Sequence, residues 1–178
     1  MINELSIELP QTMENAGRCL AANTCHRLGG ELVGRHIVVL AGSGGNGGGG
    51  LVAARRVTIC GAGVSVVLGR PRDEVRGVPA YQLDFLDRMG VQVWTPEQFP
   101  LDLLKQADRI IDAVIGYSLQ GPPREPIASP IRAANRVPAP VIALDVPSGL
   151  DGDSGRAFEP TIRAATTPSL ALPKMGPA

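Results

Sequence analysis

Two aspartates occupy positions where a carboxylate is costly unless something in the molecule satisfies it. Asp112 lies within the apolar segment 110–114, and Asp145 follows the apolar segment 140–144. A carboxylate in such surroundings must be hydrogen-bonded, paired with a positive charge or bound to a cation. We therefore interpret both as site residues. The alternative is that N–H groups of neighbouring loops satisfy each one.

A run of glycines at 42–50, Gly-Ser-Gly-Gly-Asn-Gly-Gly-Gly-Gly, lies between an apolar segment and a segment of helical period. Glycines at such a point let backbone N–H groups approach an anion closely, and the start of the helix adds partial positive charge. The sequence predicts that the N–H groups of 44–50 hold a phosphate; a flexible turn without a ligand is the alternative. Gly42, Gly44 and Gly47 match the dinucleotide pattern Gly-x-Gly-x-x-Gly, but a segment so rich in glycine contains many such spacings.

Other kinds of site have less support. Ser148 precedes Gly149, but no histidine is near and Gly-x-Ser-x-Gly is absent, which argues against a Ser-His-Asp hydrolase. The cysteines Cys19, Cys25 and Cys60 lack the paired spacing of a disulfide framework or a zinc site. We expect them to be small buried residues in a reducing compartment.

The composition indicates a globular chain and excludes several partners. With 178 residues, 44% of them hydrophobic and 19% charged, the chain is expected to form a single domain over 1–178. Zero net charge and 3% aromatic residues argue against a nucleic acid or an anionic membrane as partner. No apolar stretch approaches the ~20 residues of a membrane span. Glu4 and Glu8 make the opening residues unlike a signal peptide, so we expect a cytoplasmic protein.

Segments of strand length alternate with segments of helical period. We predict strands at 36–41, 64–68, 91–94, 109–114 and 140–146, with a weaker sixth candidate at 169–172. We predict helices at 11–28, 48–60, 79–89, 97–106 and 126–135, the first capped by Thr12 and stopped by Gly29 and Gly30. Continuously apolar strands are typical of parallel strands buried on both faces. The sequence therefore predicts a three-layer α/β sandwich, mostly parallel, that binds ligands beyond the carboxyl ends of its strands.

Five motifs in order give the chain a specific resemblance to the NAD(P)H-hydrate epimerase family, also called the YjeF N-terminal domain. They span nearly the whole chain. The matching stretches are Met13-Glu14-Asn15-Ala16-Gly17, the segment 42–51, Asp112-Ala113 with Gly116, Asp145-Val146-Pro147-Ser148-Gly149-Leu150-Asp151 with Gly155, and Pro173-Lys174-Met175-Gly176.

The resemblance implies a Rossmann-like fold and a reaction on hydrated NADH or NADPH (NADHX or NADPHX). The family interconverts the R and S epimers at the hydroxyl-bearing carbon, so that a separate dehydratase can repair the S form. The resemblance also implies a bound potassium ion, for which Asn46, Asp112 and Ser148 are the expected ligands, and Asp145 as the acid/base. We further expect a homodimer.

The same resemblance assigns the nucleotide to two loops and to Asp145. The segment 116–122 resembles the family's phosphate- and substrate-facing loop. The expected binding residues are Gly44, Gly45, Asn46, Gly47, Gly48, Gly49, Gly116, Tyr117, Ser118, Leu119, Gln120, Gly121, Pro122 and Asp145.

Departures from the family pattern leave two alternatives open. The family loop reads Gly-Pro-Gly-Asn-Asn-Gly-Gly-Asp-Gly, whereas Ser43, Gly45 and Gly49 stand here for the proline, the first asparagine and the aspartate. This loss of polar groups favours a non-catalytic nucleotide-binding or scaffold module on the same fold. A conventional NADP-dependent oxidoreductase would rest on the glycine pattern and on Arg70. That arginine is placed either to meet a 2′-phosphate or to be a solvated loop charge.

Overall fold

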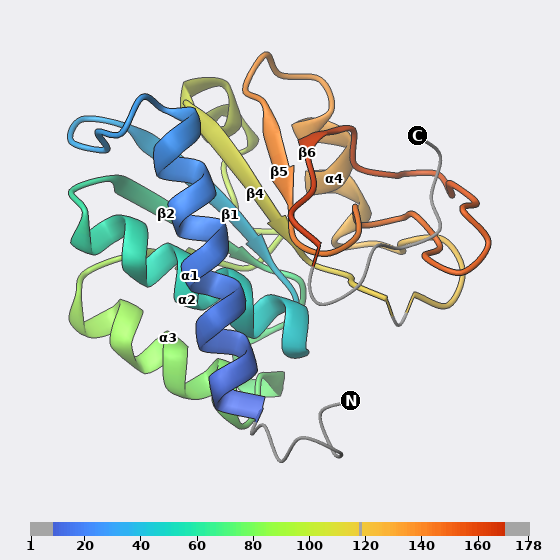
Figure 1. Ribbon diagram of the computed structural model, residues 1–178. Helices are drawn as coiled ribbons and strands as arrows, with labels where there is room; N and C mark the ends of the chain where they lie inside the picture. Colours follow the sequence, from blue (N-terminus) through green and yellow to red (C-terminus); the bar gives the residue numbers. More distant parts are fainter. Residues whose placement is uncertain (1–8, 118, 170–178) are drawn as a thin grey trace.

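A six-stranded sheet, parallel between all neighbouring strands, forms the centre of the protein in the computed structural model, which describes residues 9–117 and 119–169 (Figure 1). The strand order is β3-β2-β1-β4-β5-β6. The prediction of an α/β fold with a parallel sheet is confirmed. The strands are β1 His36–Ala41, β2 Gly63–Leu68, β3 Gln92–Trp94, β4 Arg109–Ala113, β5 Val141–Ala143 and β6 Ala164–Thr166.

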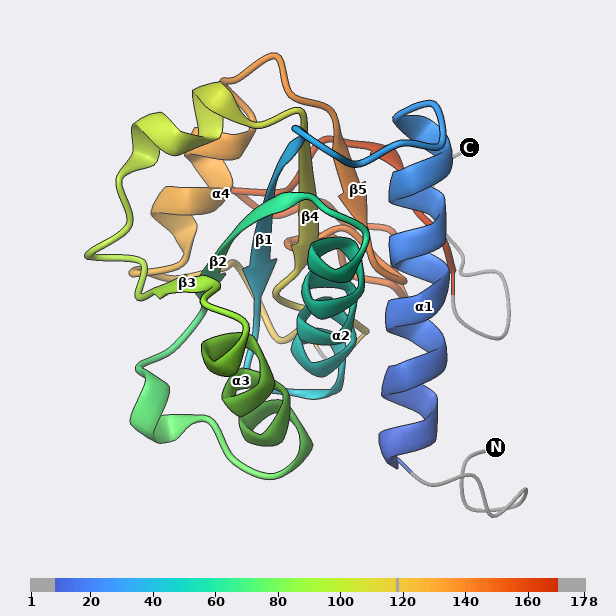
Figure 2. The same cartoon turned by 90° about the vertical axis from the view of Figure 1, so that its left-hand side faces the viewer.

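Helices cover both faces of the sheet (Figure 2). One face carries α1 Leu9–Arg27, α2 Gly45–Ile59 and α3 Val78–Arg88; the other carries α4 Ala128–Ala134 and the 3-10 helix η2 Leu101–Gln106. A further 3-10 turn, η1 Arg72–Glu74, follows β2.

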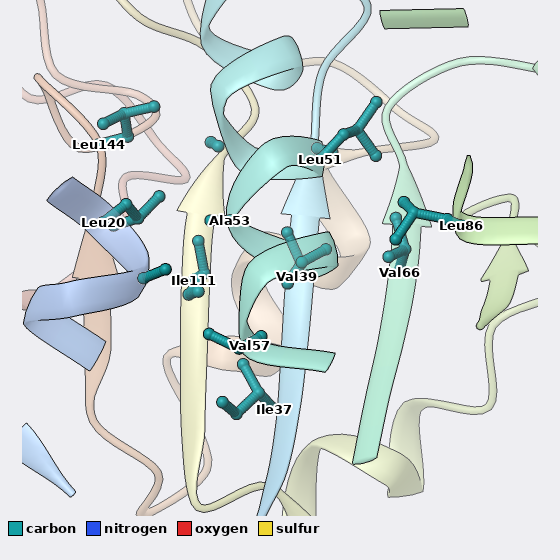
Figure 3. Close-up of a cluster of buried hydrophobic side chains, with 14 of the residues drawn as sticks. Leu20, Ile37, Val39, Leu51, Ala53, Val57, Val66, Leu86, Ile111 and Leu144 are labelled. Atoms are coloured by element: carbon teal, nitrogen blue, oxygen red, sulfur yellow. The ribbon is translucent and has the colours of Figure 1, made fainter. Parts of the chain in front are cut away.

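Successive residues of the central strand β1 pack into different cores. Ile37 and Val39 join the core under α1, α2 and α3 (Figure 3), whereas Val38 and Leu40 join the core under α4. All four are fully buried. The continuously apolar sequence of β1 follows directly, because both faces of a central parallel strand are covered.

The glycine run proves to be the start of a buried helix. Helix α2 begins at Gly45, earlier than the 48–60 predicted, and Gly47, Gly48 and Gly50 in its first two turns leave no room for a Cβ. A Cβ at Gly47 would lie 1.7 Å from the carbonyl oxygen of Gly42, and one at Gly50 would lie 2.6 Å from Cβ of Ala113. A Cβ at Gly48 would lie 2.4 Å from Sδ of Met13 in α1. Close packing of α2 therefore accounts for much of the glycine content.

The structure corrects several predicted elements. The helix predicted at 97–106 is the 3-10 helix at 101–106, because Pro100 directly before it cannot occupy a helix interior. Thr12 lies inside the first turn of α1 and is not its cap, since the helix begins at Leu9. The sixth strand is 164–166, and Ser169 is not in a strand; the rest of the candidate at 169–172 lies outside the described residues.

Two glycines after α1 end this helix as predicted. Gly29 and Gly30 follow α1 with positive φ, and the Gly30 N–H donates to the Cys25 carbonyl, so the predicted stop is confirmed. The expectation of buried cysteines is wrong for Cys19 and Cys60, which are exposed. Within residues 9–117 and 119–169, no helix has both the length and the apolar character to cross a membrane.

Candidate functional site

A hollow of about 960 Å³ opens at the carboxyl edge of the sheet. It lies where the strand order reverses between β1 and β4, which is where open α/β sheets bind ligands. Its walls come from the segments that follow four strands and from the first turn of α1. The lining residues are Leu9, Thr12, 42–46 after β1, 69–71 with Glu74 after β2, 114–117 and 119–127 after β4, and Asp145 after β5.

The glycine run contributes to the hollow only through its first part. Gly44 and Gly45 are exposed, Asn46 is partly exposed, and all three line the hollow at the N-terminal end of α2. Gly47, Gly48 and Gly49 are buried and do not line it. Free N–H groups and the helix dipole make this end of α2 suited to an anion. Direct ligand contact is therefore available at 44–46, while 47–49 hold the helix against the rest of the molecule.

Asp112 and Ser148 form a fully buried pair behind the hollow. Asp112 lies in β4, and Ser148 lies in the segment after β5. The Ser148 hydroxyl donates to Asp112 Oδ1 at 2.6 Å, and the Ser148 N–H donates to Oδ2 at 2.7 Å. The Val114 N–H also donates to Oδ1, at 3.3 Å. Both side chains have 0% exposure, and no ion pair to Asp112 occurs among the described residues.

This environment makes Asp112 reluctant to ionise. Burial raises the pKa of Asp112 to about 6, although hydrogen bonds from the Ser148 hydroxyl, the Ser148 N–H and the Val114 N–H act to lower it. Because the pKa in the folded state lies above the ordinary value of 3.8, the folded protein holds this proton more firmly than the unfolded chain. The resulting stabilisation is fully present below about pH 4 and is lost as the pH rises through about 6.

Without potassium or sodium, the stability of the wild type should therefore fall relative to Asp112→Asn between pH 4 and pH 7. The free energy of unfolding of the wild type, measured relative to that of Asp112→Asn, should fall by on the order of 2–3 kcal/mol over this pH range. Urea unfolding at several pH values in a tetramethylammonium buffer measures it. Asparagine cannot ionise, so groups that titrate elsewhere cancel in the comparison. A difference that stays constant over this range would contradict the assignment of a raised pKa to Asp112.

Asp112 and Ser148 keep oxygen lone pairs of the kind that suits a hard cation. A carboxylate has about four lone-pair positions and a hydroxyl two. The three hydrogen bonds to Asp112 leave one position, and the Ser148 hydroxyl accepts a single backbone hydrogen bond, from the Ile115 N–H at 2.9 Å. Asn46 Nδ2 donates to the Leu144 carbonyl at 3.2 Å. Its Oδ1 lies beside Gly116, where an added Cβ would be 3.2 Å away.

Asp145 occupies an unusual backbone position at the mouth of the same site. Its φ is 66°, and it is the one non-glycine residue with positive φ in the described part of the chain. The Val146 N–H donates to the Leu144 carbonyl at 2.8 Å, so Asp145 is the central residue of a γ-turn. Its own N–H donates to the Pro168 carbonyl at 3.0 Å. Such strained positions cluster at functional sites, and Asp145, which is partly exposed, lines the hollow.

The predicted substrate loop forms part of the wall of the hollow. Gly116, Tyr117, Leu119, Gln120, Gly121 and Pro122 all line it. The Tyr117 hydroxyl donates to Asp153, and its ring packs on Gly152, so this loop is tied to the one that follows β5. Ser118 lies outside the described residues, as does the predicted motif at 173–176.

Some lining residues were not predicted. Leu9, Thr12, Glu74 and Ile127 border the hollow but lie outside the matching motifs. The motif from Met13 to Gly17 could have pointed to Leu9 and Thr12, because it marks the part of α1 that packs on α2. Met13 meets Gly48, and Gly17 meets Val52. Glu14 bonds Arg55 Nη2 at 2.7 Å and Arg56 Nε at 3.0 Å.

Comparison with known proteins establishes the family of the chain. The family model described as "YjeF-related protein N-terminus" matches residues 10–176. The chain belongs to this family.

Relatives with assigned names come from bacteria and archaea. The chain is 43% identical over 178 residues to the NAD(P)H-hydrate epimerase of Dehalogenimonas lykanthroporepellens, covering 98% of this chain and 70% of that protein. It is 40% identical over 171 residues to the bifunctional NAD(P)H-hydrate repair enzyme Nnr of Pyrobaculum aerophilum, covering 92% of this chain and 33% of that one. The chain thus spans only about a third of the bifunctional relatives.

A solved structure supports the fold. The crystal structure of the yeast protein ynu0 (YNL200c) superposes with a TM-score of 0.85 at 32% identity, covering 96% of this chain and 74% of that one.

Proposed function

We propose that this chain is an isomerase that interconverts the R and S epimers of NADHX and NADPHX. One observation carries the proposal: the start of α2, which suits a phosphate, and the strained Asp145 face the same hollow in a chain 43% identical to a named epimerase. The isomerase predicted from the sequence agrees with the names of the relatives.

Asp145 is proposed as the acid/base. Inverting a carbon that bears a hydroxyl requires a bond at that carbon to break and re-form on the other face. When the C–O bond breaks, a carboxylic acid beside the ring protonates the hydroxyl, which leaves as water. The resulting carboxylate then takes a proton from the water that adds to the other face, so that the acid is regenerated. Asp145 is suited to this role because it is partly exposed in the hollow, whereas Asp112 is fully buried behind it. The N–H groups at 44–46 would hold the pyrophosphate.

Asn46, Asp112 and Ser148 are proposed as ligands of a potassium ion. They are oxygen donors from the segments after β1, β4 and β5, and the unpaired buried carboxylate supports a cation there. A bound ion would neutralise Asp112 and hold the three strand ends together. The proposal also includes a homodimer and a separate S-specific dehydratase that consumes the product. The relatives named bifunctional repair enzymes, of which this chain spans about a third, support the second activity.

Replacing sodium with potassium at constant ionic strength should raise the stability of the wild type by roughly 1–3 kcal/mol, because the ion binds only the folded state. Asp112→Asn should lose this response. Asp108→Asn is the matched control. Asp108 lies directly before β4, at the opposite edge of the sheet, where it pairs with Arg35 at 3.0 Å. Thermal unfolding of the three proteins in both salts measures the effect. An equal response in wild type and Asp112→Asn would count against these ligands.

The nucleotide part of the proposal can be tested by NMR. NADP⁺, a stable form of the cofactor, should shift the amide signals of Gly44, Gly45, Asn46 and Gly116 in ¹⁵N-labelled protein. Signals at the amino edge of the sheet, such as that of His36, should stay in place. Shifts confined to the amino edge, or no shift at millimolar NADP⁺, would contradict a nucleotide site in the hollow.

A further inference from the structure

The end of the hollow farthest from Asp145 has no role in the proposed chemistry. It is formed by the segment after β2, with Gly69, Arg70, Pro71 and Glu74. The Gly69 N–H donates to the Ala41 carbonyl at 2.7 Å, which fixes this segment beside the start of the glycine run. Arg70 is thus anchored through its neighbour at the rim of the hollow.

The hollow spans the ends of four neighbouring strands. Strands β2, β1, β4 and β5 are consecutive neighbours in the sheet. Three strand spacings separate the segment after β2 from Asp145, which amounts to ~14 Å. A hydrated nicotinamide ring at Asp145, with the pyrophosphate at the start of α2, directs the adenosine toward the end of β2. This placement rests on the proposed function.

The arginine at that end favours an anionic adenosine ribose. Directly after β2 the sequence is Gly69-Arg70-Pro71, without the carboxylate that accepts a hydrogen bond from a ribose 2′-hydroxyl in many dinucleotide folds. Arg70 contacts Glu74 at 3.4 Å, with side-chain exposures of 64% and 51%. An ion pair this exposed is weak. The Arg70 guanidinium is therefore able to bind an incoming phosphate.

We propose that Arg70 binds the 2′-phosphate of the adenosine ribose and makes NADPHX the preferred substrate over NADHX. The guanidinium presents a fork of N–H donors to phosphate oxygens. Glu74 competes for the same donors and faces the same hollow, so it weakens the preference. Arg124, the other arginine of the hollow, lies in the segment after β4, and we expect it to affect both substrates alike.

Calorimetric titration with NADP⁺ and NAD⁺ tests the inference without requiring catalysis. We expect the wild type to bind NADP⁺ roughly ten-fold or more tightly than NAD⁺, as a charge-assisted contact to phosphate predicts. Arg70→Ala should remove this preference by weakening NADP⁺ alone, and Glu74→Ala should increase it. Arg124→Ala is the matched control and should leave the ratio of the two dissociation constants unchanged. Added salt should reduce the preference.

Two results would overturn the inference while leaving the proposed function in place: equal affinity of the wild type for both dinucleotides, or equal weakening of both by Arg70→Ala. Binding of neither dinucleotide at millimolar concentration would overturn the proposed function and this inference with it. The ratio of kcat/KM for the R epimers of NADPHX and NADHX should change with Arg70→Ala in the same way as the ratio of affinities.

Discussion

Replacing Asp145 by asparagine is expected to lower the epimerisation rate by roughly 10²-fold or more, because the amide cannot exchange a proton near neutral pH. Dinucleotide affinity should change by only a few-fold. Asparagine keeps the size of the side chain, and it is one of the few residues that tolerate the positive φ of 66° found here. The variant should therefore fold normally. Single-turnover rates on R-NADHX, together with titration of NADP⁺, separate chemistry from binding.

Two further variants sharpen this experiment. Asp145→Gly should relieve the backbone strain, so its melting temperature should equal or exceed that of the wild type although its activity is lost. Asp108→Asn removes a carboxylate at the far edge of the sheet and should retain the wild-type rate. An Asp145→Asn protein that keeps its rate within a few-fold would remove Asp145 from the chemistry.

Adding one methyl group at Gly47 is expected to damage both the fold and the site. The new Cβ would lie 1.7 Å from the carbonyl oxygen of Gly42 and 2.3 Å from its carbonyl carbon. These are backbone atoms, which cannot move aside as a flexible side chain does. The start of α2 must separate from the end of β1, at a cost of about 3 kcal/mol or more. Dinucleotide affinity should fall with it by at least roughly ten-fold, since the N–H groups at 44–46 are displaced.

Gly45→Ala is a matched control only two residues away in the same helix turn. A Cβ at Gly45 has Met13 Cε as its nearest neighbour, at 3.9 Å. Alanine is favoured over glycine in helices by up to ~1 kcal/mol, so this variant should be as stable as the wild type or slightly more so. Urea unfolding of both variants measures the contrast in stability, and NADP⁺ titration of Gly47→Ala against the wild type measures the effect on the site. Equal stability of Gly47→Ala and Gly45→Ala would show that the close approach of α2 to β1 is not required.

Sequence reasoning was most successful where burial alone determines structure. The strand predicted at 36–41 has the bounds of β1, because the apolar run at 37–41 is typical of a strand covered on both faces. The position of Asp112 within β4 also followed from the sequence, since a carboxylate between isoleucines and alanine needs a structural reason. Strand β6 could not be found in this way, because three small or polar residues, Ala164–Thr166, carry no such pattern.

The glycine run shows what pattern reasoning misses. From the sequence, its glycines were assigned to a phosphate and the changes at Gly45 and Gly49 to a loss of polar contacts. The structure separates the two positions. Gly45 borders the hollow, whereas a Cβ at Gly49 would lie 2.9 Å from Cδ2 of Leu144 and 3.4 Å from Cβ of Ala16. The change at Gly49 thus concerns the packing of α2, and only the change at Gly45 bears on the alternative of a non-catalytic scaffold.

The strain at Asp145 also lies beyond sequence reasoning. No residue pattern predicts a γ-turn with positive φ at an aspartate, because the turn depends on one local backbone hydrogen bond and on one to a distant part of the chain. These are the bond that closes the turn between Val146 and Leu144 and the bond from Asp145 to Pro168. The sequence identified the residue, and the tertiary structure gives it its orientation.

The most direct measurement is the rate at which pure R-NADHX becomes S-NADHX, followed through consumption of the S form by an excess of S-specific dehydratase in potassium buffer. An epimerase site at the hollow predicts that catalytic amounts of the wild-type protein raise this rate at least roughly ten-fold above the spontaneous one. Adding the same amount of Asp145→Asn should leave it near the spontaneous value. A rate that the wild-type protein does not change, with NADP⁺ unbound at millimolar concentration, would contradict the assignment of this hollow as an epimerase site.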